Sequence, residues 1–182
     1  MPDRSMSDTL DAFGVLLEEF DEITRQAHER YRGYTPADLV ELDSRAQAAC
    51  TYCHMGAEAD RRFIDRSGVR TFDIRGQRLW LFDDVNAVVR LKKMDEDGTT
   101  RNYPTKQARD FDRGYDLPGL PMPPVRITAG YLLDKTGSTF VRTQIARPIG
   151  QKKTLWCAAV IPPEERKAGE RIWKDVTRQG SL

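Results

Sequence analysis

The chain has few of the residues on which most recognisable active sites depend. It contains two histidines and three cysteines among 182 residues. It also lacks the motifs G-x-x-x-x-G-K-S/T, G-x-G-x-x-G and H-E-x-x-H, which mark phosphate-binding loops, dinucleotide-binding folds and zinc peptidases. A Ser-His-Asp or Cys-His site would need His28 or His54 to meet a nucleophile from elsewhere in the fold. No motif therefore names a reaction, and whether the protein is an enzyme stays open, with a non-catalytic role favoured.

Long hydrophobic runs are missing as well. No apolar stretch approaches the roughly 20 residues that a membrane-spanning helix needs. Residues 1–11 carry acidic side chains and no apolar core of a secretory signal. We therefore expect a cytoplasmic protein with no membrane partner. In that setting Cys50, Cys53 and Cys157 predict free thiols rather than a disulfide framework.

The charge is distributed unevenly along the chain. Residues 1–68 hold 14 acidic and 8 basic residues, whereas residues 69–182 hold 14 acidic and 21 basic residues. The change falls where the apolar pattern switches from helical to strand-like spacing. We therefore expect an acidic helical part, 1–68, and a basic α+β part, 69–182, packed as one unit. The asymmetry indicates either a polyanionic partner or two surfaces that attract each other.

Two helices are expected in the acidic part. A seam with spacings of three and four residues predicts the first over residues 6–32, with Ser7 as N-cap and Gly33 at its end; the seam is Leu10, Phe13, Leu17, Phe20, Thr24, Ala27 and Tyr31. Thr35 and Pro36 begin a second helix that should run to about Arg66. Its expected seam is Leu39, Leu42, Ala46, Ala49 and Cys53, resumed by Phe63 after a polar gap. The two helices would form an antiparallel hairpin, which either packs on its own domain, the favoured interpretation, or dimerises as a coiled coil through self-association.

The basic part reads as short strands with two helices. The strands are expected over 69–74, 77–82, 85–94, 125–134, 138–147 and 154–161, with a brief further strand through Tyr103. A short helix is expected over 104–113, a glycine- and proline-rich loop over 114–124 and a final helix over 163–178. The predicted fold class is α+β. It consists of the N-terminal helical hairpin, then a mainly antiparallel sheet of about five or six strands with a short inserted helix and a C-terminal helix.

A cluster of basic residues is the broadest candidate site. It consists of Arg90, Lys92, Lys93, Arg101, Lys106, Arg109 and Arg113. Strand alternation places Arg90 and Lys92 on one face and Val89 and Leu91 on the other. Such cations could hold the phosphates of a nucleic acid, with Tyr103, Phe111 and Tyr115 stacking on bases. The competing interpretation, which we favour, is a solvated face neutralised by nearby acids, or the counter-surface of the acidic hairpin.

The string Cys50-Thr51-Tyr52-Cys53-His54 matches the C-x-x-C-H pattern of haem attachment. Haem attachment requires an extracytoplasmic compartment, for which the sequence gives no export signal. A zinc site could use Cys50, Cys53 and His54, with His28 or Cys157 as a fourth ligand, but no second C-x-x-C is present. A thioredoxin-like redox site should open a helix after a strand, which this string does not. Buried thiols and a surface histidine are therefore favoured, and no cofactor is expected.

Residues 104–156 resemble uncharacterised bacterial proteins encoded beside ImmA/IrrE-type metallopeptidases. The resemblance rests on Thr105–Phe111, on Leu117-Pro118-Gly119-Leu120-Pro121, and on Gly130–Asp134 with Gly137. Such neighbourhoods are typical of prophage, toxin–antitoxin-like and stress-response loci. Because this chain has no H-E-x-x-H, the resemblance implies the peptidase's partner rather than the peptidase, and it supplies no catalytic residues.

The leading hypothesis is a bacterial or phage-type binding and regulatory protein. The acidic helices would mediate protein association, and the basic part would contact a nucleic acid or another protein. One alternative is a nucleic-acid-acting enzyme or toxin that holds phosphates with Arg90, Lys92, Lys106 and Arg109. Another is a metal- or haem-binding protein that uses Cys50, Cys53 and His54.

Overall fold

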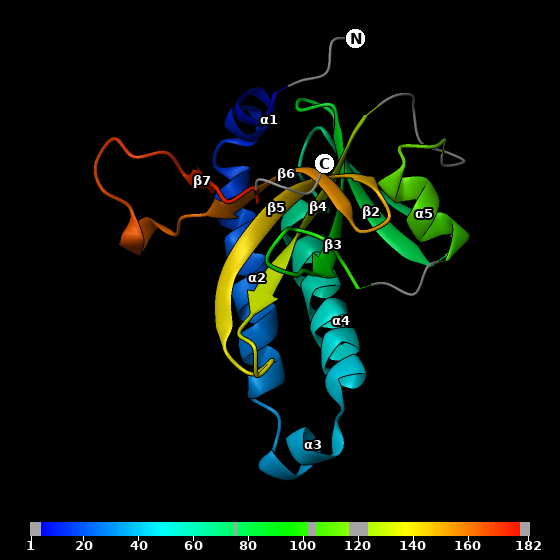
Figure 1. Cartoon of the computed structure of the whole chain (residues 1–182), viewed down its shortest axis with the longest axis vertical. Helices are drawn as coiled ribbons and strands as arrows, with labels where there is room; N and C mark the ends of the chain where they lie inside the picture. The colour runs from blue at the N-terminus through cyan, green and yellow to red at the C-terminus, as the bar shows by residue number, and fades with distance from the viewer. Residues whose placement is uncertain (1–4, 75, 102–104, 117–123, 179–182) are drawn as a thin grey trace.

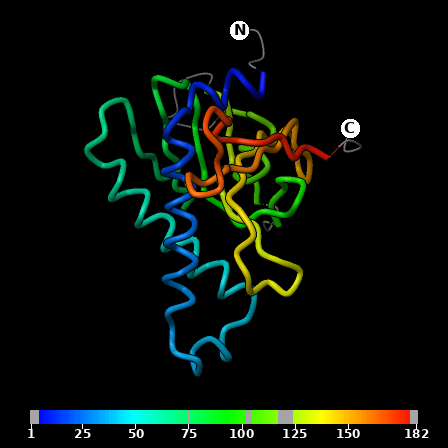
Figure 2. The backbone as a smooth tube through the Cα atoms, turned by 90° about the vertical axis from the view of Figure 1, so that its left-hand side faces the viewer, coloured from blue at the N-terminus to red at the C-terminus, as the bar shows by residue number. Residues whose placement is uncertain are grey.

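The computed structural model describes residues 5–74, 76–101, 105–116 and 124–178. It confirms an α+β fold with a helical N-terminal part followed by a sheet. α2 (Leu16–Arg32) and α4 (Ser44–Phe63) run side by side along one face of the sheet, whereas α5 (Lys106–Asp112) lies away from them (Figure 1). α1 (Met6–Phe13) lies at one end of the molecule and α3 (Pro36–Glu41) at the other (Figure 2). No helix in the described ranges is both long and apolar enough to cross a bilayer.

The N-terminal part contains more helices than its sequence predicts. They are α1 (Met6–Phe13), α2 (Leu16–Arg32), α3 (Pro36–Glu41) and α4 (Ser44–Phe63). The expected helix over 6–32 is interrupted at Gly14, which takes the positive φ of +51° that side chains disfavour. Its N-cap is Ser5 rather than Ser7, since the Ser5 hydroxyl accepts from the backbone N–H of Asp8 at 3.1 Å.

The sheet has seven strands in the described residues, one or two more than expected. They are β1 (Val69–Ile74), β2 (Gln77–Phe82), β3 (Ala87–Lys93), β4 (Val125–Leu133), β5 (Phe140–Gly150), β6 (Lys153–Val160) and β7 (Trp173–Asp175). They lie in sequence order, and neighbours are antiparallel except β3 and β4. α5 (Lys106–Asp112) lies between those two parallel strands in the chain, as a parallel pair requires a crossover connection. The sheet is therefore mixed, and it is mainly antiparallel as predicted.

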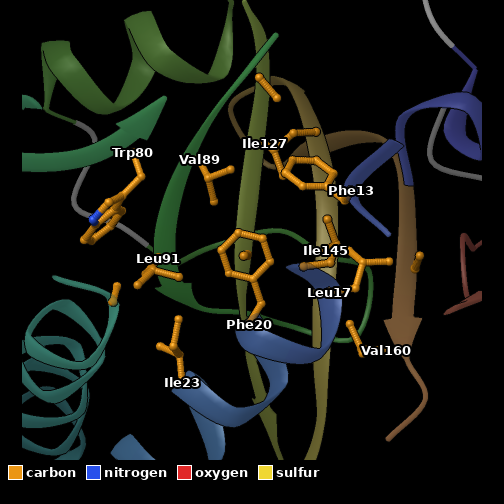
Figure 3. Close-up of a cluster of buried hydrophobic side chains, with 14 of the residues drawn as sticks. Phe13, Leu17, Phe20, Ile23, Trp80, Val89, Leu91, Ile127, Ile145 and Val160 are labelled. Carbon is orange, nitrogen blue, oxygen red and sulfur yellow. The ribbon is translucent and has the colours of Figure 1, made fainter. Parts of the chain in front are cut away.

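The predicted seam of the first helix is confirmed, because all seven of its residues are buried. Figure 3 shows Phe13, Leu17, Phe20 and Ile23 facing a layer of sheet side chains. That layer includes Trp80, Val89, Leu91, Ile127, Ile145 and Val160. Phe13, Phe20, Phe63 and Phe82 meet edge to face with ring centroids 5.3–6.0 Å apart. A single cluster of apolar side chains thus joins the helices to the sheet.

The seam predicted for the second helix is wrong except at Phe63, which is buried as expected. The predicted helix is interrupted at Leu42 and Asp43. Asp43 caps α4 by accepting hydrogen bonds from the backbone N–H groups of Arg45 and Ala46. The break resets the helical phase, so Ala49 and Cys53 are exposed. The buried face of α4 is instead Thr51, Met55, Ala59 and Phe63.

The predicted C-terminal helix over 163–178 is also wrong. A single 3-10 turn spans Pro163–Glu165, and residues 173–175 form β7. β7 pairs with the outer edge of β6, which would otherwise expose a row of backbone donors and acceptors. Trp173 is buried there, and its indole N–H donates to Asp11 at 2.9 Å. The predicted strand through Tyr103 and much of the predicted loop over 114–124 lie outside the described residues.

The acidic and basic parts of the chain are in direct contact. Arg78 pairs with Asp60 at 2.7 Å, and Arg166 pairs with Glu18 at 2.5 Å. In the core, the buried carboxylate of Asp21 accepts from Thr143 on β5 at 2.5 Å and from Arg25 at 2.7 Å. These contacts link α2 and α4 to the basic part of the chain by charge as well as by apolar packing.

Candidate anion-binding cleft

A cleft of about 890 Å³ opens between α4 and the sheet. Three segments line it: the first half of α4, the end of β3 with the loop after it, and the β4–β5 turn, joined by Arg101 and Arg178. Figure 1 shows the lower ends of these elements beside one another. The side-chain amide of Gln47 on α4 donates to the carbonyl of Gly137 at 3.0 Å, which ties the turn to the helix. Sites for small ligands commonly have a volume of this size.

Two local features shape the walls of the cleft. The β4–β5 turn is held by Asp134, whose carboxylate accepts from Thr136 and from the backbone N–H groups of Ser138 and Thr139. The loop after β3 turns at Gly98 with a φ of +77°. A Cβ atom there would lie 2.8 Å from both Ala146 and Cys157, so only glycine lets the loop pack this closely on the sheet.

The carboxylates that line the cleft already have partners. Asp95 accepts from Arg101 at 3.0 Å, and Glu96 pairs with Arg178. Asp97 accepts from the backbone and the hydroxyl of Thr99 at 3.0 and 2.7 Å. The internal contacts of Asp134 in the turn lower the pKa of its carboxyl, with the backbone N–H of Thr139 as the largest cause. Two of the four carboxylates are thus ion-paired, and the other two accept hydrogen bonds from neutral groups of their own segments.

Four cations of the cleft differ in this respect. Within the described ranges, no carboxylate lies at ion-pairing distance from these side chains, which are Arg45, Lys92, Lys93 and Lys135. Arg45 on α4 and Lys135 in the β4–β5 turn are exposed, whereas Lys92 and Lys93 are half-buried at the end of β3. The cleft thus carries a positive charge that its own acids do not neutralise.

Of these four cations, Lys92 has the most buried side chain. Its ammonium is 4.9 Å from the centre of the Tyr52 ring on α4, a cation–π contact. Burial and, after it, the neighbouring charge of Arg90 lower the pKa of Lys92 to about 8, whereas the charge of Asp112 opposes the shift. Burial and the charge of Arg101 also lower the pKa of Lys93, whereas Asp95 raises it. Both pKa shifts have the direction expected when burial makes the charged form of a lysine less favourable. A bound anion would offset that cost.

The structure separates the seven basic residues that the sequence grouped together. The strand alternation is confirmed, since Val89 and Leu91 belong to the core beneath the helices. Arg90 points to the opposite face and lies beneath α5, where it is 2% exposed. It pairs with Asp112, donates to Thr128 at 3.0 Å and lies 4.3 Å from the Phe111 ring centre. Arg90 is therefore part of the packing of α5 and is not a surface cation.

The other six fall into two groups. Lys92, Lys93 and Arg101 line the cleft, and Arg101 is the one already paired with Asp95. Lys106 and Arg109 are exposed on α5, and Arg113, which follows the helix, lies 6.0 Å from the Tyr115 ring. Neither α5 nor Arg113 contributes to the lining of the cleft. The helix and strand cations thus do not form the continuous surface that the sequence suggested.

The Cys50-Thr51-Tyr52-Cys53-His54 string lies on α4 as an ordinary helical segment. Cys53 is exposed, Cys50 is half-buried, and the Nε2 atom of His54 is 2.8 Å from the hydroxyl of Tyr34. His28 packs instead against the rings of Tyr131 and Phe140, and Cys157 is buried in the sheet. In the described part of the chain, no group of three or more His, Cys, Asp and Glu side chains is placed to hold a metal ion.

Three residues of the cleft were missed by the sequence interpretation: Arg45, Tyr52 and Lys135. Each lies in a segment with another explanation, since two belong to a helix and one to a hairpin turn. Lys135 follows Asp134 in a turn, and charged residues are common in turns. Only the folded chain brings them to the same cleft as Lys92 and Lys93.

Comparison of the chain with protein-family models, curated proteins and solved structures gave no match.

Proposed function

We propose that this protein is a binding protein whose cleft takes a phosphate-bearing ligand, either a nucleic-acid strand or a free nucleotide. The observation that carries the proposal is the contrast between the two kinds of charge in the cleft. The acids Asp95, Glu96, Asp97 and Asp134 are held by internal partners, whereas Arg45, Lys92, Lys93 and Lys135 have none among the described residues. Several unpaired cations around one volume suit an anion with more than one charge, and lysine is a common phosphate ligand.

Salt-dependent binding of labelled single-stranded DNA and RNA, measured by fluorescence anisotropy, tests the strand form of the proposal. Each phosphate contact contributes about 0.7 to the slope of log affinity against log salt for single strands. The double variant Lys93→Gln/Lys135→Gln should therefore weaken binding and reduce that slope by about 1.4.

The matched control is Lys106→Gln/Arg109→Gln, which removes two exposed cations of α5 outside the cleft. It should leave the affinity and the slope nearly unchanged. Competition with a nucleoside triphosphate and with inorganic phosphate distinguishes the two ligand sources, because a nucleotide site is emptied by the triphosphate and a strand site resists it. Loss of binding in the α5 variant with no loss in the cleft variant would contradict the assignment to the cleft.

The wider role remains a prediction. A binding protein of a prophage, toxin–antitoxin-like or stress-response locus agrees with the resemblance of residues 104–156, although Leu117–Pro121 lie outside the described residues. Self-association through the N-terminal helices stays a separate prediction that sedimentation analysis of the full chain can check.

A further inference from the structure

Lys92 differs from an ordinary phosphate-binding lysine in its position. It is half-buried at the end of β3, lines the cleft and has its ammonium over the ring of Tyr52 at 4.9 Å. Lys93 follows it in the same strand, and Arg45 lines the cleft from α4. An amine that lies within a cleft and is flanked by other cations is placed to meet the uncharged end of an anionic molecule.

From this placement we infer that Lys92 is a reactive amine that captures a phosphate-bearing aldehyde or ketone as an imine. The inference rests on the proposed function, since Arg45, Lys93 and Lys135 would hold the phosphate while Lys92 meets the carbonyl carbon. The neutral amine adds to that carbon, a proton moves from nitrogen to oxygen, and loss of one water leaves the C=N bond. No oxidant or reductant is needed, and the reaction reverses by addition of water.

Burial, and after it the charge of Arg90 on the same strand, favours a neutral amine at Lys92. Asp112 of α5 is the attractive charge that acts on Lys92, and it is engaged by Arg90. The other charged and titratable groups of the cleft are Asp95, Glu96, Asp97, Arg101, Asp134, Lys135 and Arg178, with Tyr52 beneath.

A difference in reactivity from the surface lysines follows. With a pKa of about 8, Lys92 has a neutral fraction at pH 7.5 on the order of a hundredfold larger than a lysine of ordinary pKa near 10.5. Attack on a carbonyl requires the neutral amine. The rate of imine formation at Lys92 should therefore rise with pH and level off above about pH 8, whereas surface lysines continue to gain reactivity up to much higher pH.

Pyridoxal 5′-phosphate is a suitable probe because it carries both an aldehyde and a phosphate. The full chain is mixed with one equivalent at pH 7.5, reduced with borohydride, digested and analysed by mass spectrometry. We expect one label on Lys92, and its loss in Lys92→Arg, which keeps the charge and removes the nucleophile. The matched controls Lys93→Arg and Lys135→Arg should keep the label on Lys92.

Pyridoxal without the phosphate separates this inference from the proposed function. Preferential labelling of Lys92 by both aldehydes, with the phosphorylated one faster, supports the reactive amine and the phosphate site together. Equal rates support the amine and contradict the phosphate site. Reversible binding of pyridoxal phosphate at the cleft without a label on Lys92, or labels spread over lysines according to exposure, would overturn the reactive amine.

Discussion

The buried ion pair between Arg90 and Asp112 gives the sharpest test of how α5 is held on the sheet. Arg90 is 2% exposed and has contacts with three neighbours: the carboxylate of Asp112, the hydroxyl of Thr128 at 3.0 Å and the ring of Phe111 at 4.3 Å. Asp112 is the only one of these partners that carries a compensating charge. Replacing it with leucine therefore leaves a guanidinium buried without a counter-charge.

The expected loss from Asp112→Leu is about 3–5 kcal/mol of unfolding free energy, the range for removing one partner of a buried pair. The pair itself, however, is not expected to be strongly stabilising. Burial lowers the pKa of Arg90 and raises the pKa of Asp112, in each case against the attraction of the partner. The cost of taking the two charges out of water thus exceeds what their attraction returns.

The double variant Arg90→Met/Asp112→Leu follows from this balance. It replaces both charges by apolar side chains, so it should be more stable than Asp112→Leu alone and lie within about 2 kcal/mol of the parent protein. Urea unfolding monitored by the fluorescence of the buried tryptophans measures all three variants, including Arg90→Met. The unfolding free energies can be compared if the m-value is the same for the variants and the parent protein. A double variant that loses at least the sum of the two single losses would refute the reasoning, because the two residues would then act independently.

Three further predictions concern positions at or near the cleft. Gly130→Ala would place a Cβ atom 1.7 Å from the carbonyl oxygen of Lys92, so we expect a loss of about 3 kcal/mol in urea unfolding, whereas Gly56→Ala, with open space, should be neutral or stabilising. Burial raises the pKa of the Cys157 thiol to about 12, so a thiol reagent at pH 8 should modify the exposed thiol of α4 in the folded protein and reach Cys157 only on unfolding. Burial also lowers the pKa of His28 below 6.5, so the contribution of neutral His28 to stability is full above pH 6.5 and is lost as the pH falls through the folded-state pKa. The variant His28→Leu should reduce this loss of stability at low pH, and an unchanged pH profile of stability would contradict the prediction.

The first helical seam was predictable because apolar spacing alone specifies which face of a helix is buried. Thr35 and Pro36 likewise mark the start of α3 as expected, with the Thr35 hydroxyl accepting from the backbone N–H of Asp38. The second seam failed at Leu42 and Asp43, where Asp43 caps α4. Both residues have extended backbone, so the helical phase expected from α3 does not continue into α4.

The C-terminal segment shows a different limit of sequence reasoning. Ile172, Trp173 and Val176 have helical spacing, yet residues 173–175 form an edge strand. The helix propensity of a short segment is weak. Pairing with the free edge of β6 and the hydrogen bond from Trp173 to Asp11 stabilise this segment more as a strand than as an isolated helix. Those partners lie far away in the sequence, so no local pattern could reveal them.

The sequence by itself determined the fold class, the buried face of the first helix, the alternation of β3 and the excess of positive charge in residues 69–182. Each of these depends on local spacing or on composition. Only the tertiary structure decided which cations are available to a ligand. It buried Arg90 against Asp112, moved Lys106 and Arg109 to a separate surface, and brought Arg45 and Lys135 to the cleft that contains Lys92. Whether a charge is free or neutralised depends on which carboxylates lie within a few ångströms of it, and that is set by packing between distant segments.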